Sequence, residues 1–211
     1  MFEEILLESF IAVGTIAFAM SGSFKAIRHE LDVFGVLVLG FSTALGGGLI
    51  RDALVHRTPS AFIDLTPAIY ALIGCAIVLF SRWFSRQQVH KLANPEGRPF
   101  LFLDALGLAA FTVLGARVGS EAGLNAFGII MLAAITGVGG GMIRDILAGE
   151  VPLVLKADFY ATATIIGGML FYILQWLSID VMTVSMITFT ATLVLRLLAI
   201  QYRWQLPKPK L

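Results

Sequence analysis

The sequence is poor in charged residues and nearly free of cysteine. Only 14% of its 211 residues are Asp, Glu, Lys or Arg, and 58% are hydrophobic, whereas an average soluble domain has about 25% charged residues. So few charges cannot cover a surface in water, which excludes a soluble enzyme and a disordered regulator. The single cysteine, Cys75, excludes an intrachain disulfide and a multi-cysteine metal site. A formal net charge of +1 leaves no basic excess for binding nucleic acid.

The sequence is rich in long apolar runs. A transmembrane helix needs roughly 20 apolar residues, and seven runs reach or approach that length: 5–24, 33–54, 67–84, 100–118, 126–148, 158–177 and 181–202. The linkers between them are too short for a soluble domain. We therefore predict an all-α membrane protein with seven transmembrane helices, forming a single domain over residues 1–211 in contact with membrane lipids.

Basic residues in the flanks and loops are distributed unevenly between the two sides that these spans define. Ten lie on the side of the first loop: Lys25, Arg28, Arg82, Arg86, Lys91, Arg98, Lys156, Arg203, Lys208 and Lys210. Only Arg57 and Arg117 lie on the other side. Because cytoplasmic loops carry the excess of Lys and Arg, we predict an N-terminus outside and a C-terminus in the cytoplasm. The short basic tail and the lack of a targeting signal favour a prokaryotic plasma membrane over the endoplasmic reticulum.

The chain contains an internal repeat. A shift of 93 positions aligns residues 12–59 with 105–152 without a gap, with 18 identities in 48 positions. Each copy holds three spans, an odd number, so the second copy would be inverted in the membrane. We predict two inverted three-helix repeats, about 5–84 and about 100–177, followed by an extra helix at about 181–202. This arrangement is typical of transport proteins, with a duplicated scaffold as the alternative.

Each repeat carries a glycine triplet, Gly46–Gly48 in the first and Gly139–Gly141 in the second. A glycine inside a helix costs about 1 kcal/mol relative to alanine, so the triplets need an explanation. Close packing of helices through small residues is one. We favour another, in which the helix bends or unwinds and turns its carbonyls toward a pore. Thr43 and Thr136, one turn earlier, could offer hydroxyls to a permeating ion or bond back to their own helix.

After each triplet and two intervening residues come an arginine and an aspartate: Arg51, Asp52, Arg144 and Asp145. The arginines lie about 11 Å from the centres of their spans, on opposite sides of the midplane after inversion. Such arginines could snorkel to the headgroups. Adjacent helical residues point about 100° apart, so we expect each arginine to find its partner on another span. The acidic candidates are Glu8 and Asp104, and the carbonyls of the opposite helix are an alternative.

The doubled motif resembles that of a known family. Two copies of Gly-Gly-Gly-x-Ile-Arg-Asp, with a seventh span behind them, resemble the prokaryotic branch of the trimeric intracellular cation channel family, once labelled putative glycine transporters. The resemblance covers about residues 5–202. It implies a homotrimer in which each protomer has its own pore for potassium and sodium, lined by the second and fifth spans. The corresponding pore residues here are Gly46, Gly47, Gly48, Arg51, Asp52, Gly139, Gly140, Gly141, Arg144 and Asp145.

These observations predict a monovalent cation channel gated by bending at the two triplets, with Arg51 and Arg144 as latch residues held by acidic partners. A secondary transporter of a small zwitterion such as glycine is the alternative, because inverted repeats and broken helices suit it as well. The sequence has no His-Glu-x-x-His and no Gly-x-Ser-x-Gly motif. We therefore expect no enzymatic activity, no metal and no cofactor.

Overall fold

The described part of the chain is entirely helical. The computed structural model describes residues 2–84, 97–156 and 159–204, and every regular element within these ranges is an α-helix. The longer helices are α1 (Phe2–Arg28), α2 (Val33–Leu54), α4 (Thr66–Phe84), α6 (Arg98–Glu121), α7 (Ala126–Leu147), α9 (Ala161–Trp176) and α10 (Val181–Tyr202). Single-turn helices α3 (Ser60–Ile63) and α8 (Leu153–Lys156) follow α2 and α7. The all-α prediction is confirmed, and each expected span coincides with a helix to within a few residues.

Several of these helices are suited to a lipid environment. Within the described ranges α1, α2, α6, α7 and α10 are long and apolar enough to cross a membrane, and α4 and α9 contain shorter apolar stretches. Large apolar side chains are exposed, among them Phe34 and Phe127 at 73% each. Exposure on this scale is unusual for a soluble monomer. The chain is therefore a multi-pass membrane protein, and the count of seven spans stays a prediction.

The repeat seen in the sequence recurs in the backbone. Asp32 and Asn125, which are 93 positions apart, cap α2 and α7 by accepting hydrogen bonds from the backbone N–H three residues later, at 2.7 and 2.9 Å. The turns before these caps contain Glu30 and Gly123, again 93 positions apart, with φ of 56° and 69°. Both copies therefore start their second helix with the same local structure.

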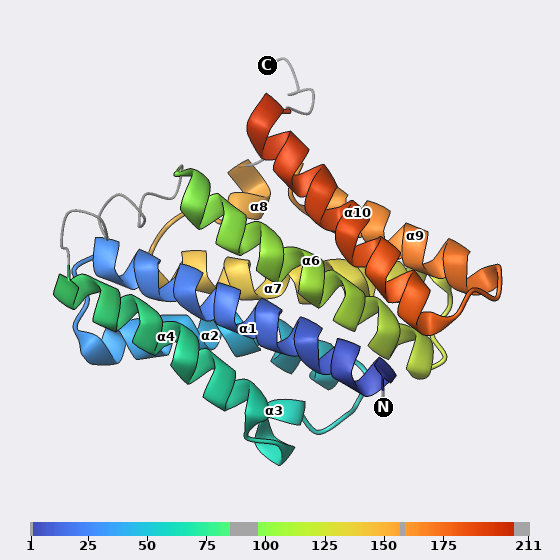
Figure 1. The fold of residues 1–211 in the computed structure, drawn as a ribbon, viewed down its shortest axis with the longest axis horizontal. Helices are drawn as coiled ribbons and strands as arrows, with labels where there is room; N and C mark the ends of the chain where they lie inside the picture. Colours follow the sequence, from blue (N-terminus) through green and yellow to red (C-terminus); the bar gives the residue numbers. More distant parts are fainter. Residues whose placement is uncertain (1, 85–96, 157–158, 205–211) are drawn as a thin grey trace.

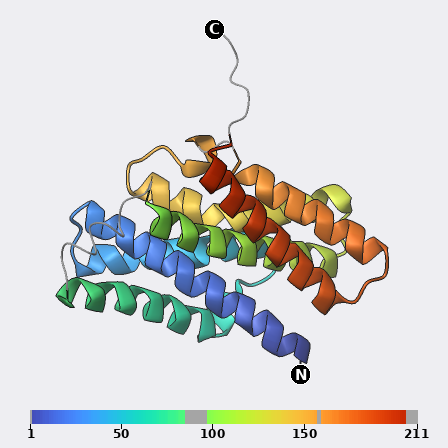
Figure 2. The same cartoon turned by 45° about the horizontal axis from the view of Figure 1, so that its top comes forward.

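Four helices form the centre of the bundle. α1 packs against α2 and α6, and α7 packs against α2 and α6, so that the four close a ring. α4 covers α1 and α2 on one side, and α9 covers α6 and α7 on the other (Figure 1). α10 has no counterpart in the first repeat and lies against α6 and α9, as the turned view in Figure 2 also shows.

The glycine triplets bring α2 and α7 into direct contact. A Cβ atom on Gly47 would collide with the carbonyl oxygen of Thr136, and one on Gly140 would collide with that of Thr43. The contact is thus reciprocal: Gly47 and Gly140 are equivalent in the two repeats, and so are the threonines that they face. Beside it the rings of Phe18 and Phe111, another pair 93 positions apart, stack with centroids 5.3 Å apart.

The backbone remains α-helical through both triplets, so the expectation of unwound glycines is wrong, whereas bending at the triplets stays a prediction. Close packing accounts for Gly47 and Gly140, where an added Cβ atom would collide with the facing helix. The hydroxyls of Thr43 and Thr136 bond back to the carbonyls of Leu39 and Leu132, both at 2.6 Å. Both threonines are fully buried. In this structure their hydroxyls therefore bond to their own helices, which is one of the two roles expected for them.

We predict that Gly47→Ala and Gly140→Ala each lower the free energy of unfolding by about 1–3 kcal/mol, because the added methyl group must separate α2 from α7. Gly48→Ala is the matched control, since the only neighbour of its Cβ within 4 Å would be Nη2 of Arg51 at 3.9 Å. Its unfolding free energy should stay equal or rise by up to about 1 kcal/mol. Unfolding in detergent followed by circular dichroism measures all three, and equal losses at positions 47 and 48 would contradict the packing role.

Candidate functional site: two arginines at opposite ends of the helix pair

Arg144 lies in a closed network of side chains. It is fully buried, and its Nη1 donates to Oδ1 of Asp104 and to Oγ of Ser21, both at 2.7 Å. Its Nε donates to Oδ1 of Asp145 at 2.9 Å, and its guanidinium stands 5.0 Å from the centroid of the Phe100 ring. Three helices, α1, α6 and α7, therefore meet on one guanidinium group.

Lys25 connects this network to the surface. Its Nζ lies 2.7 Å from Oδ1 of Asp145 and 3.0 Å from Oε2 of Glu150, and the lysine is only 2% exposed. Oε1 of Glu150 lies 2.8 Å from Nε2 of His29 at the rim. Partial burial raises the pKa of Glu150, but the hydrogen bonds from His29 and Lys25 outweigh it and hold this pKa below its usual range. Glu150 therefore stays ionised at neutral pH. We call Ser21, Lys25, Phe100, Asp104, Arg144 and Asp145 the Arg144 network.

The extra helix α10 reaches the same network through Tyr160. The hydroxyl of Tyr160 donates to Oδ1 of Asp104 at 3.1 Å. Arg196 of α10 stacks its guanidinium 4.7 Å from the centroid of the Tyr160 ring and donates to the carbonyl of Phe159 at 3.3 Å. Arg196 is 3% exposed, so of the two roles open for it, structural or snorkelling, the structural one is confirmed.

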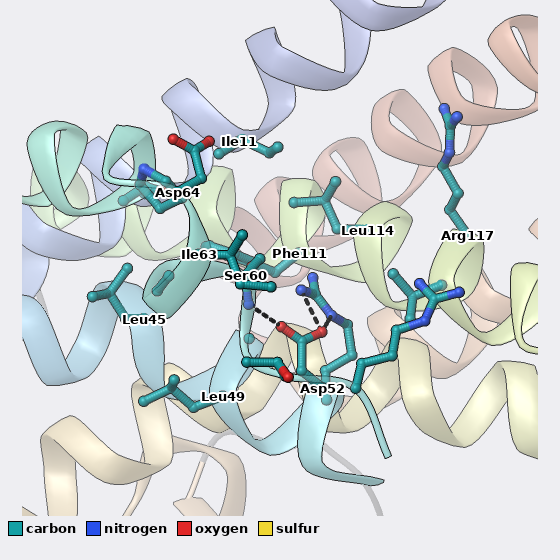
Figure 3. A pocket seen from close by; sticks show the side chains of 18 of the residues that line it. Ile11, Leu45, Leu49, Asp52, Ser60, Ile63, Asp64, Phe111, Leu114 and Arg117 are labelled. Atoms are coloured by element: carbon teal, nitrogen blue, oxygen red, sulfur yellow. Dashed lines mark hydrogen bonds and ion pairs between the residues drawn. The ribbon is translucent and has the colours of Figure 1, made fainter. Parts of the chain in front are cut away.

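Arg51 has fewer partners than Arg144. Its Nε and Nη2 both reach Oδ1 of Asp52, at 2.8 and 2.7 Å, and the residue is 8% exposed. Oδ2 of Asp52 accepts from the backbone N–H of Ser60 at 2.9 Å, as Figure 3 shows. The equivalent bond in the second repeat joins Leu153 to Asp145 at 2.8 Å.

A cavity of about 290 Å³ lies beside Arg51, and we call it the vestibule. Its apolar wall contains Leu7, Ile11, Leu45, Phe111, Leu114 and Val118. Its charged lining residues are Arg51, Asp52, Arg57, Asp64, Arg117 and Glu121. In Figure 3 Ile11 and Leu114 lie across the cavity from Asp52. The lining thus combines an apolar wall with equal numbers of acidic and basic groups.

The charges at the rim of the vestibule are partly paired. Glu121 binds two arginines, Arg117 at 2.9 Å and Arg57 at 3.4 Å. Asp64 accepts hydrogen bonds from the backbone N–H and the hydroxyl of Thr66, at 2.9 and 2.7 Å, which lower the pKa of Asp64. Asp64 therefore remains negative at neutral pH.

The vestibule occupies the place that the Arg144 network fills in the other repeat. At the shift of 93, the network residues Phe100, Asp104, Ser21 and Lys25 correspond to Leu7, Ile11, Leu114 and Val118. All four counterparts line the vestibule. The same frame of helices is thus closed by charged and polar groups around one arginine and left hollow, with apolar walls, around the other.

The partners of the arginines differ in part from those expected. Arg51 and Arg144 each bind the aspartate that follows them, so the expectation that adjacent residues do not pair is wrong. The long methylene stem of arginine lets its guanidinium turn back toward a neighbour that leaves the helix at a different angle. Asp104 is confirmed as a partner of Arg144, which excludes snorkelling for this residue. Glu8 instead accepts from the Tyr70 hydroxyl at 2.8 Å.

Lys25 and Tyr160 are the functional candidates that sequence reasoning missed. Lys25 counts among the ten basic flank residues, but it belongs to α1 and is buried. Its apolar neighbours Phe24, Ala26 and Ile27 were the available signal. Among the other basic flank residues, Arg86, Lys91, Lys208 and Lys210 lie outside the described residues. Within the described ranges no group of three or more His, Cys, Asp or Glu side chains is arranged to hold a metal ion.

Comparison with known sequences identifies relatives over nearly the whole chain. The sequence profile of a family described as Glycine transporter matches residues 8–83 and again residues 101–176, which are offset by the same 93 positions as the repeat. The UPF0126 inner membrane protein YadS of Escherichia coli K12 is 38% identical over 200 residues, which covers 92% of each chain. The chain is therefore related, over most of its length, to a bacterial inner membrane protein.

Solved structures with the same fold are cation channels. A structure described as the basis for conductance through TRIC cation channels superposes with a TM-score of 0.83 and 39% identity over 96% of each chain. The TRIC trimeric intracellular cation channel orthologue from Rhodobacter sphaeroides gives a TM-score of 0.84 and 28% identity, covering 97% of this chain and 100% of that one. The chain belongs to the trimeric intracellular cation channel family, as its doubled motif predicts.

We predict that Asp104→Asn lowers the free energy of unfolding by about 3–5 kcal/mol, because it leaves part of the buried Arg144 charge without its counter-charge. Glu8→Gln, an acid of α1 that has a single hydrogen bond and is exposed, should change it by less than about 1 kcal/mol. Denaturant titration of both variants in detergent measures the difference. Similar values for the two would mean that Asp104 does not neutralise Arg144.

Proposed function

We propose that the protein conducts potassium and sodium ions through a separate pathway in each protomer of a homotrimer. The coarser statement, a cation channel, is supported by the names of its structural neighbours, the TRIC cation channels. We further propose seven spans in two inverted repeats plus α10, with the N-terminus outside and the C-terminus in the cytoplasm. Under this orientation the vestibule opens outward, and the Arg144 network faces the cytoplasm.

The proposed pathway follows α2 and α7 from one Arg–Asp pair to the other. It enters at the vestibule, beside Arg51 and Asp52, passes the contact of Gly46–Gly48 with Gly139–Gly141, and leaves beside Arg144 and Asp145. The observation that carries this proposal is the difference between the two ends, one hollow and one filled. We infer a closed state, with the Arg144 network as the cytoplasmic gate. Bending of α2 and α7 at the triplets, which the helix contact makes interdependent, would open it.

The charges along this pathway suit a cation despite the arginines. In the Arg144 network and its rim, Arg144 and Lys25 contribute two positive charges, and Asp104, Asp145 and Glu150 contribute three negative ones. The sum, without His29, is −1. In the part of the chain that the structure describes, buried Oδ2 of Asp104 and Nη2 of Arg144 have no hydrogen-bond partner. Such incomplete pairing lowers the cost of separating the network relative to a fully paired one.

The asymmetry of the two halves favours a channel over the alternative, a transporter of a small zwitterion. Alternating access between inverted repeats requires each half to adopt the closed arrangement of the other. The closed arrangement around Arg144 uses Asp104 and Lys25, whereas the counterparts Ile11 and Val118 are apolar. The vestibule therefore cannot close around Arg51 by the same interactions, which supports gating at one end.

Purified protein in planar bilayers with a potassium gradient should show discrete unitary currents that reverse near the potassium equilibrium potential, because the charge along the pathway favours cations. Glycine added to the same bilayers should not change the size of these currents, because it does not compete with potassium for the pathway. Absence of unitary currents, together with saturable glycine uptake into liposomes of the same protein, would overturn the channel and support the transporter.

The gate can be tested at Lys25. Lys25→Gln removes the charge that joins Asp145 to Glu150 and should raise the open probability about tenfold, for a lost charged contact of about 1.5 kcal/mol. Lys156→Gln, which removes an exposed lysine of α8 at the same end, should leave the open probability unchanged. Bilayer recording measures both, and a Lys25 variant with wild-type open probability would place the gate elsewhere.

A further inference from the structure

The two repeats differ in the number of carboxylates that their arginine binds. Arg144 binds the carboxylate that follows it and a second one, Asp104, from another helix. Among the described residues, Arg51 binds the carboxylate that follows it and no other. The residue that corresponds to Asp104 is Ile11, which has no polar atom to offer. The position of the second carboxylate therefore carries an apolar side chain in the first repeat.

Space is available at this position. Ile11 and Leu114, the counterparts of Asp104 and Ser21, both line the vestibule of about 290 Å³. Arg51 lines it as well, is 8% exposed, and uses Nε and Nη2 for Asp52. Its Nη1 has no hydrogen-bond or ion-pair partner among the residues that the structure describes. A nearly buried guanidinium thus presents one free edge to a cavity.

The charge around Arg51 accommodates one more anion. In the second repeat Lys25 offsets the two carboxylates on Arg144, and its counterpart Val118 cannot do so. The vestibule has another source of positive charge, because Arg57 and Arg117 share the single carboxylate of Glu121. Glu121 thus leaves one of these two arginines without a carboxylate of its own, although the lining as a whole carries three basic and three acidic groups.

We propose that the vestibule binds a small monocarboxylate with a short aliphatic chain. Its carboxylate accepts a hydrogen bond from Nη1 of Arg51, in the place that Asp104 takes on Arg144. Its aliphatic chain lies against Leu7, Ile11 and Leu114, a wall that favours an alkyl group over an ammonium group. The pair of Arg144 and Asp104 in the second repeat is thus a model for this complex, with the Asp104 side chain in the place of the ligand's carboxylate. The site rests on the geometry of the vestibule alone, so it can exist whether or not the cation pathway does.

The test is a titration of purified protein in detergent with sodium propionate at constant ionic strength, with sodium chloride as the matched salt. The expected result is a saturable rise in Tm with propionate that chloride does not give. Arg51→Gln should weaken the apparent affinity at least about tenfold, for the loss of a charged hydrogen bond. Arg28→Gln, an exposed arginine at the other end of α1, is the control and should keep the wild-type affinity.

Ile11→Asp is the decisive variant, because it supplies the missing carboxylate from the chain itself. It should abolish the propionate effect while Arg51 is still present, and the Tm without ligand should lie above that of Ile11→Asn. Propionate stabilisation that survives in both Ile11→Asp and Arg51→Gln would overturn the site. Stabilisation by glycine and not by propionate would overturn the ligand class.

Wild-type protein alone provides a second measurement, which does not depend on the folding of any variant. Saturation-transfer NMR should show contact between the protein and the methyl protons of propionate, and acetate but not chloride should compete for it. No transfer would overturn the proposal. Because the unitary currents are first recorded in potassium chloride without propionate, their outcome is separate from this one.

Discussion

The contact between the glycine backbones of α2 and α7 is the constraint on which the rest of the structure depends. Each helix presents a face without side chains to the carbonyl of a threonine on the other, so the two axes approach more closely than any larger residue allows. Because the contact is reciprocal, it fixes the register of both helices at once. Arg51 and Arg144, three residues beyond the triplets, are thereby carried to opposite ends of the helix pair. The buried arginines and the hollow at one end follow from this register.

Around this common frame, a few side chains decide what each end can do. One end has an aspartate, a lysine and a serine where the other has isoleucine, valine and leucine. The first set binds a buried guanidinium and joins α1, α6 and α7. The second leaves its guanidinium with one carboxylate and an apolar wall. Since burying a charge costs far more than burying a methyl group, the charged end is held together by specific pairing, whereas the apolar end can hold a ligand.

Much of the fold could be read from the sequence, because apolar runs and an ungapped repeat report directly on helices and on their duplication. The doubled glycine motif was equally visible, but its structural role was not. A glycine triplet is the same pattern whether it allows a helix to unwind or to approach a neighbour, and only the position of Thr136 against Gly47 distinguishes the two. Lys25 escaped notice because a lysine near a helix end usually reaches solvent, and its burial depends on acids more than a hundred residues away. The adjacent Arg–Asp pairing depends on the conformation of a flexible stem that helix periodicity does not describe.

The equivalent positions 104 and 11 carry an aspartate beside Arg144 and an isoleucine beside Arg51. This difference has a consequence for the origin of the chain. If three helices of one kind had assembled as an antiparallel homodimer, both mouths of the assembly would have carried identical residues. A mutation that introduced a carboxylate at one end would have introduced it at the other end as well. Either both ends or neither end would then have been closed by charged groups. Joining two copies in one polypeptide removes this restriction, because each copy can then mutate alone. A fused chain can therefore have two chemically different ends, whereas a symmetric dimer cannot.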